Sequence, residues 1–208
     1  MNSNRTALVG VMLFVSALVF SGCSETGAGT PVVPTDKPNS ESASVPEVAA
    51  PLDASRYLGN PCDLVPQNSM ADLGYSEPGE KRTKETTATS IMAGPGCAWV
   101  VLDGIKSVAV FVHADNQSRG AGGLAALHEN YKLGRFAYWE PETVDGYPAA
   151  FSDVSDQRDR GGCGLAVGIA NDLSFSVSVQ GYTKQPDQAC ADAKQVAEQV
   201  ISTLKGGS

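Results

Sequence analysis

The C-terminal part of the chain carries the clearest pattern of apolar and polar positions. After residue 187, apolar side chains recur every three or four positions, as one face of an amphipathic helix requires. This stripe consists of Ala189, Ala193, Val196, Ala197, Val200, Ile201 and Leu204. Asp187 is a suitable N-cap residue and Gly206 a suitable stop, so the pattern predicts a helix between them.

Two runs upstream, residues 163–170 and 173–180, alternate strictly and predict a hairpin that turns at Asn171-Asp172. One set of alternate positions is bulky: Leu165, Val167, Ile169, Leu173, Phe175, Val177 and Val179. The other set is small: Gly164, Ala166, Gly168, Ala170, Ser174, Ser176 and Ser178. Because alternate residues of a strand point to opposite faces, we expect a bulky face under the C-terminal helix and a second face of very small side chains.

The remaining elements follow weaker patterns. A short helix should open at residues 62–66 and end near Leu73-Gly74, before a polar surface loop over residues 76–96. Residues 97–102 and 106–113 predict two strands that turn at Asp103-Gly104. A helix with Leu124, Leu127 and Tyr131 on one face should start near Gly122, and a strand should cover about residues 147–154. The expected fold class is α+β, a mostly antiparallel sheet with helices packed on it.

The N-terminus has the three parts of an export signal over residues 1–22. Arg5 precedes an apolar run, Ala7 to Phe20, and the small residues Ser21 and Gly22 come before Cys23. The run is about 14 residues long, short of the roughly 20 that span a bilayer. We expect Cys23 to be lipidated and residues 23–51 to be a disordered tether, leaving residues 52–208 as the globular domain. The alternative is an ordinary signal peptide with Cys23 incidental.

The formal net charge limits the classes of molecule that the domain is expected to bind. The chain carries −8, and removal of residues 1–22 takes away only the positive charge of Arg5, which leaves −9. A domain this acidic is repelled as a whole by nucleic acid and by anionic lipid head groups, so nucleic-acid binding is not expected. The expected location is the outer side of the cell membrane, held through the lipid anchor.

Four cysteines remain after Cys23, and an even number in an exported domain predicts disulfides, with three possible pairings. We favour Cys62–Cys97 and Cys163–Cys190 because each pair brackets one half of the domain. Cys190 also lies beside the helical stripe, where it should face the start of a strand. A metal site is not expected, since no two cysteines have the close spacing of metal ligands.

The sequence offers few groups for catalysis. It has no recognised catalytic or nucleotide-binding motif, and only His113 and His128 could act as bases at neutral pH. Both are interpreted as histidines that either lie at the surface or have their hydrogen bonds satisfied within the fold. Asp153, Asp156 and Asp159 are interpreted as a solvated acidic loop, because a calcium loop needs denser oxygen ligands. We therefore expect a protein that is not an enzyme and has no cofactor.

The best candidate binding surface is the small-residue face of the last hairpin. Its residues are Gly164, Ala166, Gly168, Ser174, Ser176 and Ser178. The alternative is that this face is simply solvated or lets a helix approach closely. A second candidate is an aromatic cluster of Phe136, Tyr138, Trp139 and Tyr147 around Pro141 and Pro148, for which core packing is the alternative. The expected function is binding of a protein partner or cell-envelope component, and the alternative is a carrier or sensor of a small apolar or glycan ligand.

Four segments, taken together, carry a resemblance to a known family. They are residues 60–65 (NPCDLV), 96–99 (GCAW), 144–149 (VDGYPA) and 189–197 (ACADAKQVA). In this order they resemble the actinobacterial lipoproteins grouped as domain of unknown function 3558. The resemblance implies an envelope lipoprotein with two disulfides, and it brings no catalytic residue and no ligand.

Overall fold

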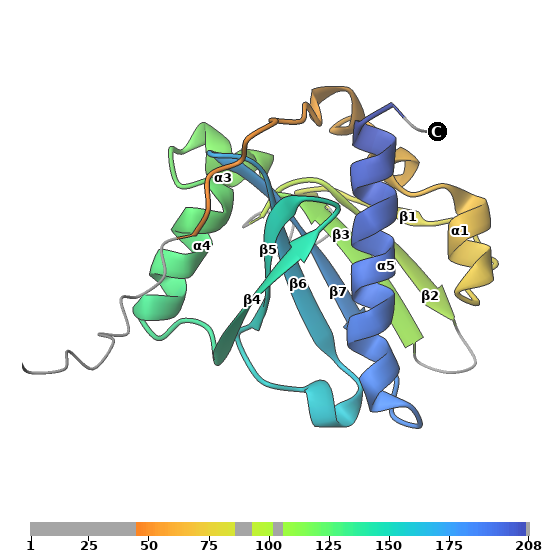
Figure 1. Ribbon diagram of the computed structural model, residues 1–208. Coiled ribbons are helices and arrows are strands. Elements are labelled where there is room, and N and C mark those ends of the chain that lie inside the picture. Colours follow the sequence, from red (N-terminus) through yellow and green to blue (C-terminus); the bar gives the residue numbers. More distant parts are fainter. Residues whose placement is uncertain (1–44, 86–92, 102–105, 207–208) are drawn as a thin grey trace, which may run out of the picture. The chain divides into compact units, whose positions relative to one another are not determined.

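A computed structural model describes residues 45–85, 93–101 and 106–206, all of which belong to one compact unit. These residues form a seven-stranded sheet in the order β1-β2-β3-β7-β6-β5-β4, in which every pair of neighbours is antiparallel. The strands are β1 (Glu80–Arg82), β2 (Gly96–Val101), β3 (Lys106–Val112), β4 (Tyr138–Val144), β5 (Tyr147–Asp153), β6 (Cys163–Ala170) and β7 (Leu173–Gln180). The predicted α+β class is confirmed (Figure 1).

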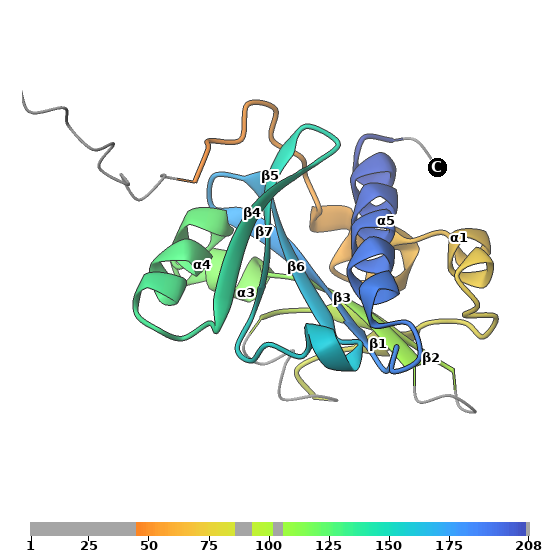
Figure 2. The same ribbon diagram turned by 60° about the horizontal axis from the view of Figure 1, so that its bottom comes forward.

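Helices lie on both sides of the sheet. The four α-helices of the described residues are α1 (Gln67–Asp72), α3 (Ala114–Ser118), α4 (Gly123–Lys132) and α5 (Pro186–Leu204). Figures 1 and 2 show α5 and the α3–α4 pair on opposite sides of β6 and β7. Three short 3-10 helices, η1 (Ser55–Tyr57), η2 (Pro61–Leu64) and η3 (Arg158–Arg160), lie in the connections. No helix of the described residues is long and apolar enough to cross a membrane.

The core forms where α5 covers the bulky face of the last hairpin, as the alternation predicts. The bulky residues of β6 and β7 are buried, and so are Ala189, Ala193, Val196, Ala197, Val200 and Ile201 of α5. The start of α5 differs from the prediction. Gln185 is the N-cap residue and Pro186 begins the helix, so Asp187 lies within the first turn. Proline suits this position because its missing N–H has no partner within a helix there.

Both predicted disulfides are present. Cys62 in η2 bonds Cys97 in β2, with the two Cα atoms 4.9 Å apart. Cys163 at the start of β6 bonds Cys190 in the first turns of α5, with a Cα separation of 5.2 Å. The second bond therefore joins the helix to the sheet that it covers.

The short helix expected from residue 62 to 74 is interrupted. Residues 61–64 form η2, and the α-helix starts only at Gln67, after Pro66. The helical conformation is disfavoured for a residue that precedes proline, and Val65 is accordingly extended. The expected stop is correct, since Gly74 adopts a left-handed conformation with φ +90°.

The two outermost strands do not appear in the sequence prediction. β1 lies within the region predicted as a loop, and it is only three residues long. β4 was missed because Glu140, Pro141 and Glu142 break the apolar alternation. An edge strand tolerates proline and charge because one side of it has no neighbour to bond. The predicted turn at Asp103-Gly104 lies outside the described residues.

The described chain begins upstream of the expected domain start at residue 52. Val48 is 7% exposed, and its N–H donates to Asn171 Oδ1 over 2.9 Å. The Tyr147 hydroxyl donates to the Ala50 carbonyl over 2.9 Å. Residues 45–51, which composition assigned to the tether, therefore pack along the sheet. Cys23 and the predicted signal peptide lie outside the described residues.

Candidate functional site

The six residues of the small-residue face lie in register across β6 and β7. Gly164 is opposite Ser178, Ala166 opposite Ser176, and Gly168 opposite Ser174. They share one face, as the alternation predicts. Gly164, Ala166, Gly168 and Ser174 are buried, however, and only Ser176 and Ser178 are half-buried. Four of the six candidate binding residues are therefore not open to a partner in this structure.

Helix α4 explains much of this burial. A Cβ atom on Gly168 would lie 3.2 Å from the Leu124 Cβ atom, so α4 packs directly on this end of the face. The start of the helix also lies against the β6–β7 turn, because a Cβ atom on Gly123 would collide with the Asn171 carbonyl. The small side chains thus allow a helix to approach closely, which is the alternative stated for them from the sequence.

His113 occupies the same face, directly after β3. Its Nδ1 shares a hydrogen bond of 2.8 Å with Ser174 Oγ, and its Nε2 shares one of 3.1 Å with Ser176 Oγ. Burial lowers the pKa of the imidazole from 6.5 to about 4, so the ring is neutral at physiological pH. In a catalytic serine–histidine pair, the second ring nitrogen bonds a third group that orients the imidazole. In this structure that nitrogen bonds a second serine hydroxyl instead. The geometry matches a satisfied buried histidine, as the sequence suggested.

A partly exposed cluster of aromatic rings, which we call the aromatic shelf, lies where α4 meets β4. The rings of His128 and Trp139 are 5.0 Å apart, and those of Tyr131 and Trp139 are 6.1 Å apart. His128 is buried beneath this pair, while Tyr131 and Trp139 are half-buried. The separations are typical of favourable aromatic contacts, which hold the indole in one orientation.

Beside this shelf a groove of about 360 Å³ is open to solvent. It is lined by Val45, Pro46, Leu124, Trp139, Pro141, Glu142, Thr143 and Ala149. A second hollow of about 280 Å³ continues along Val45, Pro46, Glu47, Val48, Leu124, Ala125, Ala170 and Asn171. We call the first of these hollows the Trp139 groove. Its lining is mainly apolar with one carboxylate and one hydroxyl, a composition suited to holding a ligand or a peptide segment.

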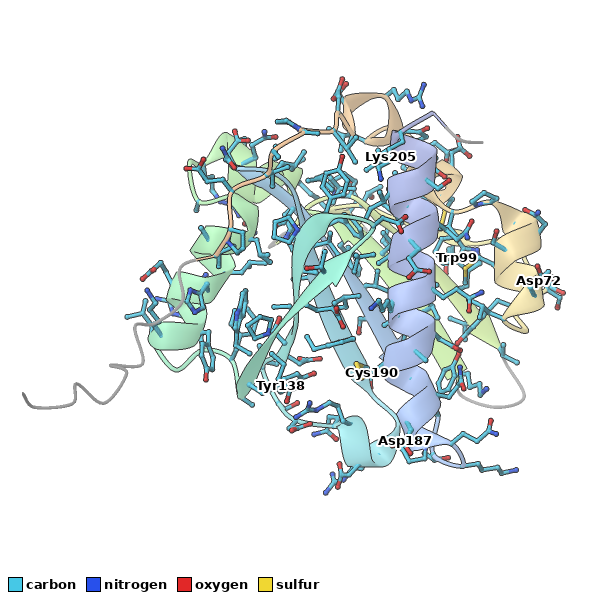
Figure 3. The ribbon with its side chains drawn as sticks, viewed as in Figure 1. Asp72, Trp99, Tyr138, Asp187, Cys190 and Lys205 are labelled. Atoms are coloured by element: carbon cyan, nitrogen blue, oxygen red, sulfur yellow. A yellow bond between two sulfur atoms is a disulfide. The ribbon has the colours of Figure 1, made fainter. Side chains whose placement is uncertain are left out.

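The predicted aromatic cluster does not form as one unit. Neighbouring strand residues point to opposite faces, so Trp139 faces α4 while Tyr138 lies beneath Arg158, 4.1 Å from the guanidinium carbon to the ring centre. Figure 3 shows Tyr138 at the lower end of β4. Tyr147 is held by Ala50 and lies beneath Lys205, at 5.1 Å. Of the predicted group, only Trp139 and Pro141 line the groove.

In the acidic loop after β5, Asp156 is held in an ion pair. Arg158 contacts both Asp156 and Glu140 at 2.7 Å. The bonds from Arg158 lower the pKa of Asp156 to about 2, while burial raises the pKa of Asp153. No group of three metal-ligating side chains occurs among the described residues.

A buried polar cluster joins α5 to the other end of the sheet. The Tyr182 hydroxyl donates to Asp192 Oδ2 over 2.5 Å, and Gln188 Nε2 donates to Oδ1 over 2.7 Å. Tyr75 meets the Tyr182 hydroxyl at 3.2 Å. Burial is the main reason that the pKa of Tyr182 is raised, and Asp192 adds to it. The carboxylate is satisfied within the core, so this cluster fastens the helix and leaves nothing for a ligand.

Sequence reasoning missed Val45 and Pro46, which line the groove, and the stack of His128 with Tyr131 beside it. The i, i+3 spacing of His128 and Tyr131 places them on one helix face and was a usable signal. Nothing in the sequence indicated that Trp139, seven residues after the helix ends, returns to that face. Val45 and Pro46 lie in a segment whose composition resembles a linker.

Comparison with known proteins gives one match. The family described as Protein of unknown function (DUF3558) matches residues 18–203. This span includes Cys23, the four paired cysteines and the Trp139 groove. No curated protein and no solved structure matches the chain.

Proposed function

The chain belongs to the family described as Protein of unknown function (DUF3558), and we propose that it is a lipoprotein of an actinobacterial cell envelope, anchored through Cys23. The domain, in this proposal, sits on the outer side of the cell membrane. It is not an enzyme and needs no cofactor. It binds a protein partner or an envelope component at the Trp139 groove.

Two features of the chain support export and anchoring. The apolar run, Ser21, Gly22 and Cys23 follow the order of a lipoprotein signal. Both disulfides belong to a class of bond that persists in oxidising compartments and is rare in the cytosol. Two or three acyl chains on one cysteine are enough for stable attachment.

The observation that carries the binding proposal is the half-buried indole of Trp139 at the edge of an apolar groove. Large aromatic side chains are enriched among the residues that dominate binding energy at interfaces. Packing against His128 and Tyr131 already orders this ring, so little conformational entropy is lost when a partner covers it. The groove is open to solvent, which suits a segment of a protein.

The second candidate function, a carrier or sensor of a small apolar or glycan ligand, is favoured by the size of the groove. Its volume of about 360 Å³ lies within the range of ligand sites. Mass spectrometry of the protein purified from its own membranes under native conditions would reveal a small molecule that stays bound.

Site-specific photocrosslinking in intact cells tests the proposal. A photoreactive amino acid at Thr143, which is exposed in the groove, should capture one defined species. The same amino acid at Gln195, exposed on α5 across the sheet, should not capture it. Trp139→Ala should abolish capture at Thr143. Equal capture from both positions would contradict the groove as the binding site.

A further inference from the structure

The turn between α4 and β4 exposes a large apolar side chain. Leu133, which ends α4, is 68% exposed. Gly134 follows in a left-handed conformation with φ +73°, and residues 133–135 and 137 are all exposed. A leucine on a protruding turn is not needed to fill the core, since a polar residue would be tolerated there. Its exposure is informative only together with its neighbours.

Those neighbours are aromatic and basic. We define the α4–β4 corner as Tyr131, Lys132, Leu133, Arg135, Phe136 and Trp139. Tyr131, Phe136 and Trp139 are half-buried, while Lys132 and Arg135 are exposed. Figures 1 and 2 show this corner at one end of α4, away from α5. Tyrosine and tryptophan beside lysine and arginine are the residues that favour the boundary between water and lipid.

The charge at the corner is opposite to that of the whole chain. From Arg119 to Trp139 the sequence has three cations and one carboxylate, Glu129, in a chain of formal charge −8. Lys132 forms an ion pair with Glu129 at 2.7 Å. Arg135 donates to the uncharged Asn130 Oδ1 at 2.8 Å, a contact that does not neutralise the guanidinium. Beyond the corner, Glu140 and Asp156 are both paired with Arg158, and Asp153, opposite Tyr138, is half-buried. The corner therefore complements an anionic surface.

The first described residues of the chain lie on the same side of the domain as the α4–β4 corner. Val45, the first described residue, lines the groove together with Trp139. In the proposed lipoprotein, 22 positions separate Cys23 from Val45. For comparison, a random-coil chain of 22 residues has a root-mean-square span of about 25 Å. The lipid anchor thus keeps this side within reach of the membrane, at an effective concentration on the order of millimolar.

We propose that the α4–β4 corner docks on the anionic lipid surface, with Leu133, Phe136 and Trp139 entering the headgroup region and Arg135 contacting lipid phosphates. This inference rests on the proposed lipid anchoring. Docking holds the domain against the bilayer and covers Trp139 with lipid, so a partner that binds the Trp139 groove competes with the membrane for this indole. Each contact is weak by itself, and the tether makes weak contacts sufficient.

Tryptophan fluorescence provides a direct test, because the chain has only two tryptophans and Trp99 is 2% exposed. The lipidated full-length protein is reconstituted into vesicles of phosphatidylglycerol and phosphatidylcholine with brominated acyl chains, which quench indoles that enter the bilayer. We expect the wild type to be quenched, and Trp139→Phe, which leaves Trp99 as the only reporter, to lose that quenching. Vesicles of phosphatidylcholine alone should quench the wild type less.

The double variant Leu133→Ser, Arg135→Glu should reduce quenching to the level of vesicles without bromine. Val100→Ser, which changes a 41% exposed apolar residue on β2, is the matched control and should be quenched like the wild type. Quenching that persists in the double variant would overturn the proposal. So would a double variant that loses partner capture at Thr143 in cells but keeps its quenching, because the corner would then be a protein interface.

Vesicle flotation separates this inference from its premise. Protein that floats with the vesicles without Trp139 quenching is anchored but not docked, which removes only the docking. Protein that does not float lacks the lipid anchor, and both the anchoring and the docking then fall.

Discussion

Protonation of His113 should make acidification destabilise the fold. The folded pKa is about 4 and the ordinary value is 6.5, so the unfolded chain takes up a proton first as the pH falls. Stability from the neutral buried ring is complete above pH 6.5 and is lost progressively down to pH 4. A difference of 2.5 pKa units corresponds to about 3 kcal/mol at 1.36 kcal/mol per unit. Below pH 4 both states are protonated, and His113 adds no further loss.

Urea unfolding at a series of pH values from 7.5 to 3.5 measures this loss, with His113→Gln as the control. Carboxylates also titrate in this range, so the test is the difference between the two proteins at each pH. Glutamine can still bond one serine hydroxyl but cannot take up a proton. The free-energy difference should favour the wild type most at neutral pH and shrink by about 3 kcal/mol as the pH falls to 4. A difference that stays constant with pH would refute the reasoning.

Three further predictions concern the disulfide, the buried face and the anchor. Removing the Cys163–Cys190 bond by double substitution with alanine should lower the free energy of unfolding by up to about 3.5 kcal/mol, the chain-entropy value for a separation of 27 residues, measured in urea. Ala166→Phe should cost about 1–3 kcal/mol because Ala166 is 4% exposed, whereas Leu133→Ser should stay within about 0.5 kcal/mol; equal melting temperatures would contradict this. Cys23→Ala should move the protein from the detergent to the aqueous phase of a Triton X-114 partition, and unchanged partitioning would argue against lipidation.

The elements that the sequence determined are those whose burial depends on one local pattern. Residues 163–180 alternate on both strands of one hairpin, and the stripe from Ala189 to Leu204 follows a single helical period. The bulky face and the stripe cover each other, as the two patterns require. The disulfide pairing followed from the same logic, because Cys163 and Cys190 begin the strand and the helix that meet. The sequence also indicated where β2, β3 and β5 lie.

Only the tertiary structure decided which elements become the outer parts of the sheet and what meets at the groove. β4 has no apolar alternation and forms because β5 offers it a paired edge, with Asp145 at φ +49° and Gly146 at φ +86° making the tight turn. Asp-Gly is a typical tight-turn pair, but no alternation marks residues 138–144 as a strand. The packing of α4 on Gly168 similarly decided that this end of the small-residue face is buried.

Trp139 and Pro141 could be named from the sequence, but their neighbours could not. Strand alternation separates Trp139 from Tyr138, and α4 supplies His128 and Tyr131 instead. Likewise, His113 could be called satisfied from its context, whereas Ser174 and Ser176 became its partners only when β3 paired with β7. Periodicity reports which face of one element is buried. Which element covers that face depends on contacts between residues far apart in the chain. A local pattern of apolar residues does not predict those contacts.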